Sequence, residues 1–225
     1  MLDDAFRFKA FAARLVIAYI ALFLLTLAFP TAYARAFSPV LEWISTRAPG
    51  ETRIRSLQLG PQAIHVEAES GLLRHFLTAE SQPGPPFAVT SDLFINAVNV
   101  YPIVVFSLLA SWPMKWKRRI LAALVSVPLV LLAGVLDTWL LVQWSGAEAF
   151  AKGWYSVASM FPTTPGNAEA GQRVQESFDQ LRAMKTFVST GGRQFFSVLI
   201  AVLSVAASSV SGHRSNPGRI APTAG

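Results

Sequence analysis

Three polar side chains interrupt apolar runs of the sequence and could carry chemistry there. Asn96 and Asn99 are three residues apart, so in a helix they share one face. Asp137 lies 17 residues after Ile120, where its own apolar run starts, and this places it about 25 Å along a helix. With Trp139 beside it, this pattern predicts a polar binding pocket at one depth of a membrane, with Asp137 as the anion and the two amides as donors.

The same residues also have a purely structural interpretation. A carboxylate inside a membrane is costly unless it is paired or reaches water, so Asp137 could reach the headgroup region or pair with an outer arginine. The two asparagines could hydrogen-bond across helices and hold them together. The sequence alone leaves both interpretations open.

Other kinds of reactive site find little support. The chain has no cysteine, which excludes disulfides, thiolate nucleophiles and zinc–thiolate sites. Its three histidines lack the spacing of a metal-binding helix. Ser204 lies in a seam of small residues, and no histidine or lysine stands near it in the sequence to activate it. We therefore expect no catalytic residue, no metal and no cofactor.

Four apolar runs are long enough to cross the roughly 30 Å hydrocarbon core of a bilayer as helices. They cover approximately residues 11–29, 93–112, 120–144 and 195–211. The whole chain, 1–225, is therefore expected to form a single integral membrane domain in contact with membrane lipids. Two outer segments, 31–92 and 145–192, connect the runs.

Positive charge gathers on one side of these runs. Four basic residues separate the second run from the third, namely Lys115, Lys117, Arg118 and Arg119. With the N-terminus in the cytoplasm, nine cations face two carboxylates on the inside, whereas the outer segments hold ten of each. The sequence thus predicts a multi-pass protein of the bacterial inner membrane with both termini in the cytoplasm. Residues 212–225 then form a cytoplasmic tail, which is expected to be disordered.

The charge pattern also bears on possible partners. The net charge of +6 arises beside the ends of the runs and does not gather on a soluble domain, which argues against nucleic acid as a partner. The first run has a competing interpretation as a secretory signal, because Ala32-Tyr33-Ala34 resembles a cleavage site. Its apolar stretch reaches back to Phe11, which favours an uncleaved span.

The outer segments have patterns of their own. Residues 53–59 and 63–68 flank Gly60-Pro61-Gln62 and predict a β-hairpin, while Ser81–Pro86 predicts a loop. A helix is expected to begin at Asn167 as its N-cap and to end at Gly191-Gly192. Its apolar stripe consists of Val174, Phe178, Leu181, Met184 and Val188. The predicted fold class is an all-α membrane protein of four transmembrane helices with a small extracytoplasmic β-hairpin and an amphipathic helix.

One stretch, from about Phe29 to Trp144, resembles a known family. An outer strand pair is followed by a span, by Trp112-Pro113, by Lys117-Arg118-Arg119 and by a further span with a polar residue some way along it. This order resembles the exosortase/archaeosortase family of membrane transpeptidases, most of all the short exosortases. The resemblance implies a role in envelope protein sorting.

The chain departs from this family at each catalytic position. The family's cysteine belongs near the outer start of the second span, where this chain reads Ser91-Asp-Leu-Phe-Ile-Asn96. Its arginine belongs to an Asn-x-x-Arg element in the third span, which here reads Gly134-Val-Leu-Asp137. Its histidine should follow on the outer side, yet no histidine occurs between His75 and His213. The resemblance therefore implies a companion that lacks sortase-type chemistry.

We accordingly expect a non-catalytic accessory or scaffold subunit associated with an exosortase-like protein-sorting or surface-export system. Its expected partner is another membrane protein, either an exosortase-like enzyme or a sorting component. Two alternatives remain. A divergent membrane enzyme could use Asp137 at the outer interface, and it would need a further acid, base or metal ligand at the same depth. A transporter or lipid-handling subunit would need polar residues along the full height of a span.

Overall fold

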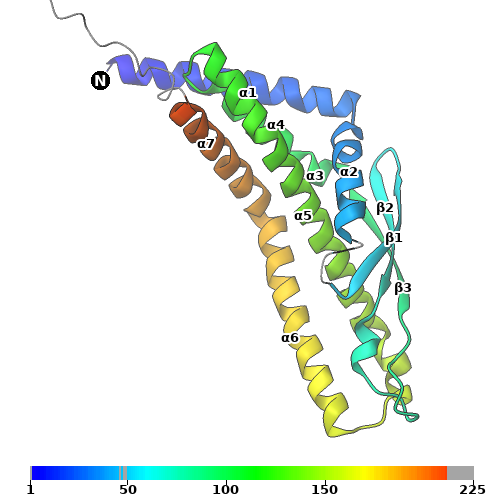
Figure 1. The fold of residues 1–225 in the computed structure, drawn as a ribbon. Coiled ribbons are helices and arrows are strands. Elements are labelled where there is room, and N and C mark those ends of the chain that lie inside the picture. The colour runs from blue at the N-terminus through cyan, green and yellow to red at the C-terminus, as the bar shows by residue number, and fades with distance from the viewer. Residues whose placement is uncertain (1, 46, 48–49, 212–225) are drawn as a thin grey trace, which may run out of the picture.

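The computed structural model describes residues 2–45, 47 and 50–211 (Figure 1). The chain is mostly helical. Its helices are α1 (Leu2–Ala28), α2 (Ala32–Ser45), α3 (Ile95–Val98), α4 (Val100–Ser111), α5 (Trp116–Val157), α6 (Pro165–Phe187) and α7 (Arg193–Ser211). Its strands are β1 (Thr52–Leu59), β2 (Ala63–Ser70) and β3 (Phe87–Phe94). The tail predicted to be disordered, residues 212–225, lies outside the described residues.

Among the described residues, three helical stretches are long and apolar enough to cross a membrane: Phe8–Ala28, Trp116–Trp154 and Pro165–Ser209. The chain is therefore a multi-pass membrane protein, as expected. The second predicted run, 93–112, differs at its start, because Leu93 and Phe94 end strand β3. The apolar helix that remains, Ile95–Ser111, is about 25 Å long, shorter than the other three.

Two long helices form the frame of the molecule. Helix α5 has 42 residues, so it is about 63 Å long and extends the predicted run 120–144 at both ends. Helices α6 and α7 run back antiparallel beside it as a nearly continuous rod (Figure 1). At the predicted break the rod is kinked, because the backbone of Gly191 is not helical. Residues Val188–Gly192 form a π-helical turn, in which Gly191 has a φ of 155° that favours glycine.

The start of α6 differs from its prediction. The helix begins at Pro165, and its N-cap is Thr164, whose hydroxyl accepts a hydrogen bond from the Asn167 amide. Proline suits the first turn of a helix because its missing N–H has no partner there in any case. Asn167 thus lies inside the first turn, which leaves its side chain free to bind elsewhere.

The predicted hairpin is present and belongs to a three-stranded antiparallel sheet in the order β1-β2-β3. Ile54 pairs with Ala68 and Leu57 with Val66, and a bulge lies between Ile54 and Ser56. Strand β3 was not expected. It continues the sheet through pairs such as Ile64 with Leu93, and it begins directly after the predicted loop and includes the start of the predicted second run.

The sheet buries one face. Ile64, Val66 and Ala68 are buried as their alternation predicts, while His65 and Glu67 are exposed. The buried face packs with Val89 and Leu93 of β3 against Phe37 and Leu41 of α2 and against Val135 and Val142 of α5. The sheet is therefore fixed to α5 through an apolar layer, and its polar face is open.

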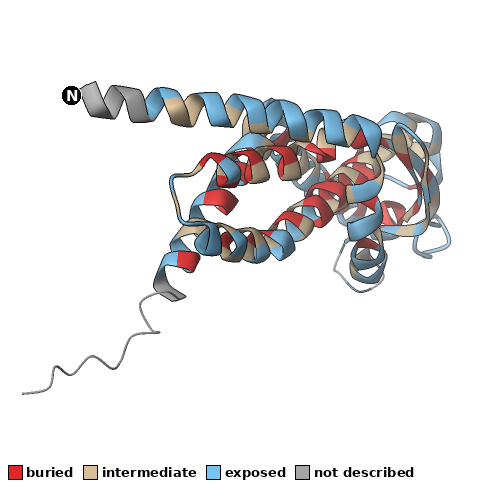
Figure 2. Cartoon of the chain, turned by 90° about the horizontal axis from the view of Figure 1, so that it is seen from above, coloured by how far each residue is buried: buried red, intermediate tan, exposed pale blue. Residues whose placement is uncertain are grey.

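The helices differ in how far they are covered. Figure 2 shows that the buried residues of the bundle lie on the inward surfaces of its helices, while α1 is exposed along most of its length. The apolar window of α1 is 0% buried, and Ile17, Phe23 and Leu24 are exposed on it. Exposed apolar residues also line α7, such as Leu199 and Leu203. Lipid is the environment that suits such surfaces.

Candidate functional site

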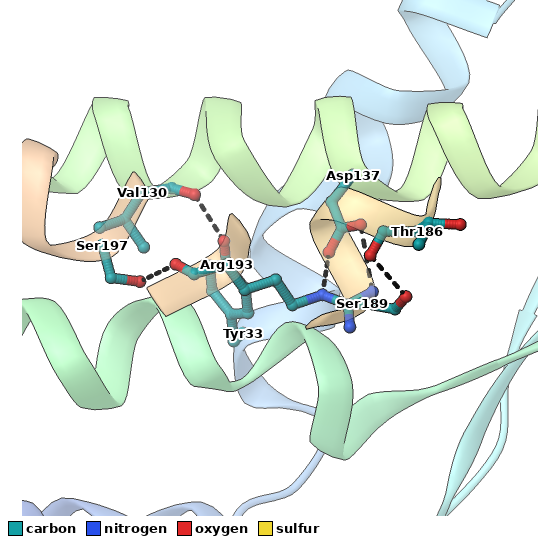
Figure 3. A network of polar contacts seen from close by, with 7 residues as sticks. All are labelled: Tyr33, Val130, Asp137, Thr186, Ser189, Arg193 and Ser197. Atoms are coloured by element: carbon teal, nitrogen blue, oxygen red, sulfur yellow. Dashed lines mark hydrogen bonds and ion pairs between the residues drawn. The ribbon is translucent and has the colours of Figure 1, made fainter. Parts of the chain in front are cut away.

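The polar centre of the helical bundle is an ion pair between Asp137 and Arg193. The Arg193 Nε donates to Asp137 Oδ2 at 2.6 Å, and Nη2 donates to Oδ1 at 3.2 Å (Figure 3). The side chain of Asp137 is 1% exposed and that of Arg193 is 13% exposed. Both carboxylate oxygens are therefore engaged by one guanidinium, which is the strongest arrangement available to such a pair.

The two partners come from helices that the fold brings together. Asp137 lies midway along α5, and Arg193 is the first residue of α7, directly after the π-helical turn. The Arg193 carbonyl accepts the hydroxyl of Ser197 at 2.7 Å, within the first turn of α7. The bend at Gly191-Gly192 thus sets where the guanidinium meets α5.

A close contact between α2 and α5 lies one turn from the pair. The Tyr33 hydroxyl donates to the Val130 carbonyl (Figure 3), and Tyr33 also packs edge-on against Phe37. Gly134 faces this ring, and a Cβ atom at that position would collide with the Tyr33 hydroxyl. Gly134 is therefore needed for the approach of the two helices.

Two cavities flank the ion pair. The first has a volume of about 360 Å³ and is almost entirely apolar. It is lined by Tyr101, Asp137, Trp139, Met184, Val188 and Phe196, among others. The second has a volume of about 340 Å³ and a mixed lining. It lies between the end of β3, helix α5 and the α6–α7 junction, with Arg193 in its wall.

The four residues predicted to form a pocket do not all meet. Asp137 and Trp139 line the apolar cavity together. Asn99 is 3% exposed, donates from Nδ2 to the Pro30 carbonyl at 3.1 Å, and lines a different cavity among α1, α2 and α4. Asn96 is exposed. Asn99 is therefore bonded to the turn between α1 and α2 and lies apart from Asp137.

Arg193 is the site residue that sequence reasoning did not single out. The sequence groups Arg193 with the cations of the outer segments. Its position directly after Gly191-Gly192, at the start of an apolar run, is the signal that could have identified it. The structural interpretation did include an arginine partner for Asp137. The partner is supplied by the same chain, so no cation of another chain is required to neutralise Asp137.

The remaining polar candidates make structural contacts. Ser204 donates to the Ile200 carbonyl at 2.8 Å and Ser208 to the Val205 carbonyl at 2.7 Å, so each bonds its own helix. Within residues 2–45, 47 and 50–211, no group of three or more histidines and carboxylates could hold a metal ion. Of the histidines in that range, His65 contacts Asp92 and His75 contacts Glu51, both pairs at exposed positions.

The basic cluster lies where the chain turns from α4 into α5. Lys115, Lys117 and Arg118 are exposed, as suits contact with lipid headgroups. Arg119 differs, because its Nη2 donates to the Trp112 carbonyl at 3.1 Å and closes the turn. The cluster therefore has three cations free for the membrane surface and one that fastens the turn.

The comparisons with known proteins add no relative. No protein-family model, curated protein or solved structure matches this chain. The interpretation of the site therefore depends on its own geometry.

Proposed function

We propose that this chain is a non-catalytic scaffold subunit of a bacterial inner membrane, which positions a partner protein of an exosortase-like sorting or surface-export system. Four helices cross the membrane in this proposal: α1, α4 with α3, α5 and α7. Both termini then lie in the cytoplasm, and the sheet stands outside. The four exposed or half-exposed cations of the α4–α5 turn lie on the cytoplasmic side, as the positive-inside rule requires.

The observation that carries this proposal is the length of the two frame helices. Helix α5 and the α6–α7 rod, which spans 45 residues within Pro165–Ser209, are each about twice as long as a bilayer core is thick. Apolar exposed residues are concentrated on α7 and the first half of α5. The second half of α5 and most of α6 therefore extend beyond the lipid and hold the sheet at a fixed height above it.

The open face of the sheet supports contact with a charged partner. Exposed or half-exposed residues of both signs cover it: Arg53, Arg55, His65, Glu67, Glu69 and Asp92. Four of these residues already form contacts within the face. Arg55 Nη2 lies 2.6 Å from Glu69 Oε2, and His65 Nδ1 lies 2.6 Å from Asp92 Oδ1. Such mixed charge favours orientation of a partner over non-specific adhesion.

The ion pair between Asp137 and Arg193 argues for a role in protein contacts and against a catalytic role for Asp137. A catalytic carboxylate must reach a substrate atom, whereas both oxygens of Asp137 already accept from Arg193. A lipid-handling role is the second candidate, because the apolar cavity of about 360 Å³ beside Asp137 could hold part of an acyl chain. In that case lipid extraction assays with purified protein would detect transfer between vesicles.

The topology can be tested with single cysteines, since the natural chain has none to remove. An impermeant maleimide applied to intact spheroplasts should label Thr90→Cys on the sheet, whereas Lys117→Cys should be labelled only after the membrane is permeabilised. Labelling of Lys117→Cys in intact spheroplasts would reverse the proposed orientation.

The scaffold role can be tested by cross-linking in the native membrane. A photo-reactive residue at exposed Thr90 should cross-link to a membrane protein of the sorting system, identified by mass spectrometry. The same residue at Leu24, which is 57% exposed on α1, is the control and should cross-link mainly to lipid. A complete absence of protein cross-links from Thr90 in cells that carry out sorting would contradict the scaffold role.

A further inference from the structure

The mixed cavity beside the ion pair has the features of a built anion site. Its volume is about 340 Å³, and its walls come from β3, α3, α5, α6 and α7. Leu93, Val98 and Leu141 form an apolar part. The polar part contains Asp92, Thr138, Ser145, Glu148, Lys185 and Arg193. A cavity that combines these two parts suits an amphiphilic ligand.

Thr138 gives the first independent sign of a missing partner. The residue is 1% exposed, and its Oγ1 has no hydrogen-bond partner. A buried helical threonine commonly bonds the carbonyl one turn back, and a hydroxyl left unpaired destabilises the fold. The residue lines the cavity and its hydroxyl is covered, so a rotation of the side chain would let it donate to an acceptor that a ligand there supplies.

Two cations supply the charge. Lys185 places its Nζ 4.6 Å from the centre of the Trp144 ring, and within the described part of the chain it forms no ion pair. Arg193 binds Asp137 through Nε and Nη2, and no described residue accepts from its Nη1. Cationic donors from two helices therefore face one cavity.

The two acids in the wall also have partners of their own. Asp92 contacts His65 Nδ1 at 2.6 Å, and its side chain is 64% exposed. Glu148 contacts Lys152 Nζ at 2.9 Å and accepts from Trp144 Nε1 at 3.1 Å. Glu148 also lies within electrostatic range of Lys185, and Asp137 binds Arg193, so both cations already have an acid nearby while the Lys185 ammonium keeps hydrogen-bond donors for a further anion.

We propose that this cavity binds the phosphate group of a membrane phospholipid, with Thr138, Lys185 and Arg193 as its donors. Arg193 stands at the start of the apolar helix α7, and Trp144 of α5 contacts Lys185 near the end of α6, as suits the interface where lipid phosphates lie. The apolar residues of the wall would contact the glycerol and the first acyl carbons. This assignment rests on the proposed crossing of the membrane by α7, but not on the scaffold role or on any sorting partner.

The test is titration of the full-length protein, purified in a neutral detergent, with short-chain phosphatidylglycerol, followed by calorimetry. Wild-type protein should bind it. Thr138→Val keeps the shape of the side chain but removes the hydroxyl, and Lys185→Gln removes the charge, so each should weaken binding about tenfold. Thr138→Ser and Lys185→Arg restore the donors and should restore binding.

The matched control is Arg182→Gln, which removes an exposed cation from α6 that does not line the cavity, and it should bind as wild type. Unfolding midpoints equal to that of wild type show that the variants are folded. If Thr138→Val does not fold, the affinities of Lys185→Gln and Lys185→Arg decide whether the cavity binds the lipid phosphate. Unchanged affinity in Lys185→Gln, or equally tight binding of inorganic phosphate in place of the lipid, would overturn the proposal.

Discussion

The two halves of this molecule are held together by different forces. In the apolar half, formed by α1, α4, residues 116–140 of α5 and α7, the packed helices also share a buried ion pair and small serines bonded to their own helices. The close approach at Gly134 joins this half to α2. In the sheet half, formed by α2, the sheet, residues 141–157 and α6, they depend on packed apolar side chains. Phe76 contacts Phe150, Trp154 and Phe161 there, with ring centres 4.7 to 5.9 Å apart.

Solvent accounts for the contrast. Lipid chains are as apolar as leucine, so burying leucine between helices in a membrane gains little free energy, and small residues and polar pairs must hold the helices. In water, burial of aromatic surface is itself stabilising. Variants that break a polar pair should therefore destabilise the apolar half most. Variants that remove a large aromatic side chain should destabilise the sheet half most.

The largest expected effect comes from breaking the ion pair on one side. Asp137→Asn or Arg193→Gln leaves the other charge buried without its partner, which should lower the free energy of unfolding by about 3 to 5 kcal/mol. The double variant Asp137→Asn/Arg193→Gln should lose much less, because no charge is then left unpaired. Unfolding in detergent, followed by circular dichroism, measures this double-mutant cycle, and additive losses would contradict the pairing.

A somewhat smaller loss, about 3 kcal/mol, is expected for Phe76→Ala in the sheet half, because it empties the centre of an aromatic cluster. Phe76 is 2% exposed, and Phe94→Ala is the matched control since Phe94 is 70% exposed. Limited proteolysis should cut the sheet half of Phe76→Ala while α1 and α7 stay protected. Equal effects of the two variants would show that the cluster does not stabilise this half.

A still smaller effect is expected from Gly134→Ala. The added methyl meets the Tyr33 hydroxyl, so α2 and α5 must separate, at a cost of about 1 to 3 kcal/mol. Gly153→Ala on the same helix meets nothing within 4 Å and should be neutral or slightly stabilising, because alanine favours helix. A midpoint of thermal unfolding that is unchanged in Gly134→Ala would contradict the close helix contact.

The sequence was informative where a local pattern determines structure. The hairpin followed from alternation around Gly60-Pro61-Gln62, and the apolar helices followed from their length. Strand β3 was missed because Ser81–Pro86 ends just before it and because Leu93 and Phe94 also read as the start of an apolar helix. The N-cap was placed at Asn167 because asparagine favours that position, whereas Thr164 before Pro165 makes the bond.

The candidate site was only half predictable for a different reason. Asp137 is conspicuous in an apolar run, but its partner lies 56 residues away and is selected by the crossing of α5 and α7. Asn167 shows the same limit, since it exchanges two hydrogen bonds with the Leu77 backbone across 90 residues. Such pairings depend on tertiary contacts that no local pattern contains.

The central claim is that Asp137 holds the helices together and does not act on a substrate. The most direct measurement is envelope protein sorting, read as the surface display of sorted proteins, in cells that carry Asp137→Asn/Arg193→Gln as their only copy. The account predicts sorting at the wild-type level in the double variant, with loss in either single variant only in proportion to its loss of folded protein. Lost sorting in cells that hold normal amounts of folded double variant would contradict it, because the charge of Asp137 would then have a role other than pairing with Arg193.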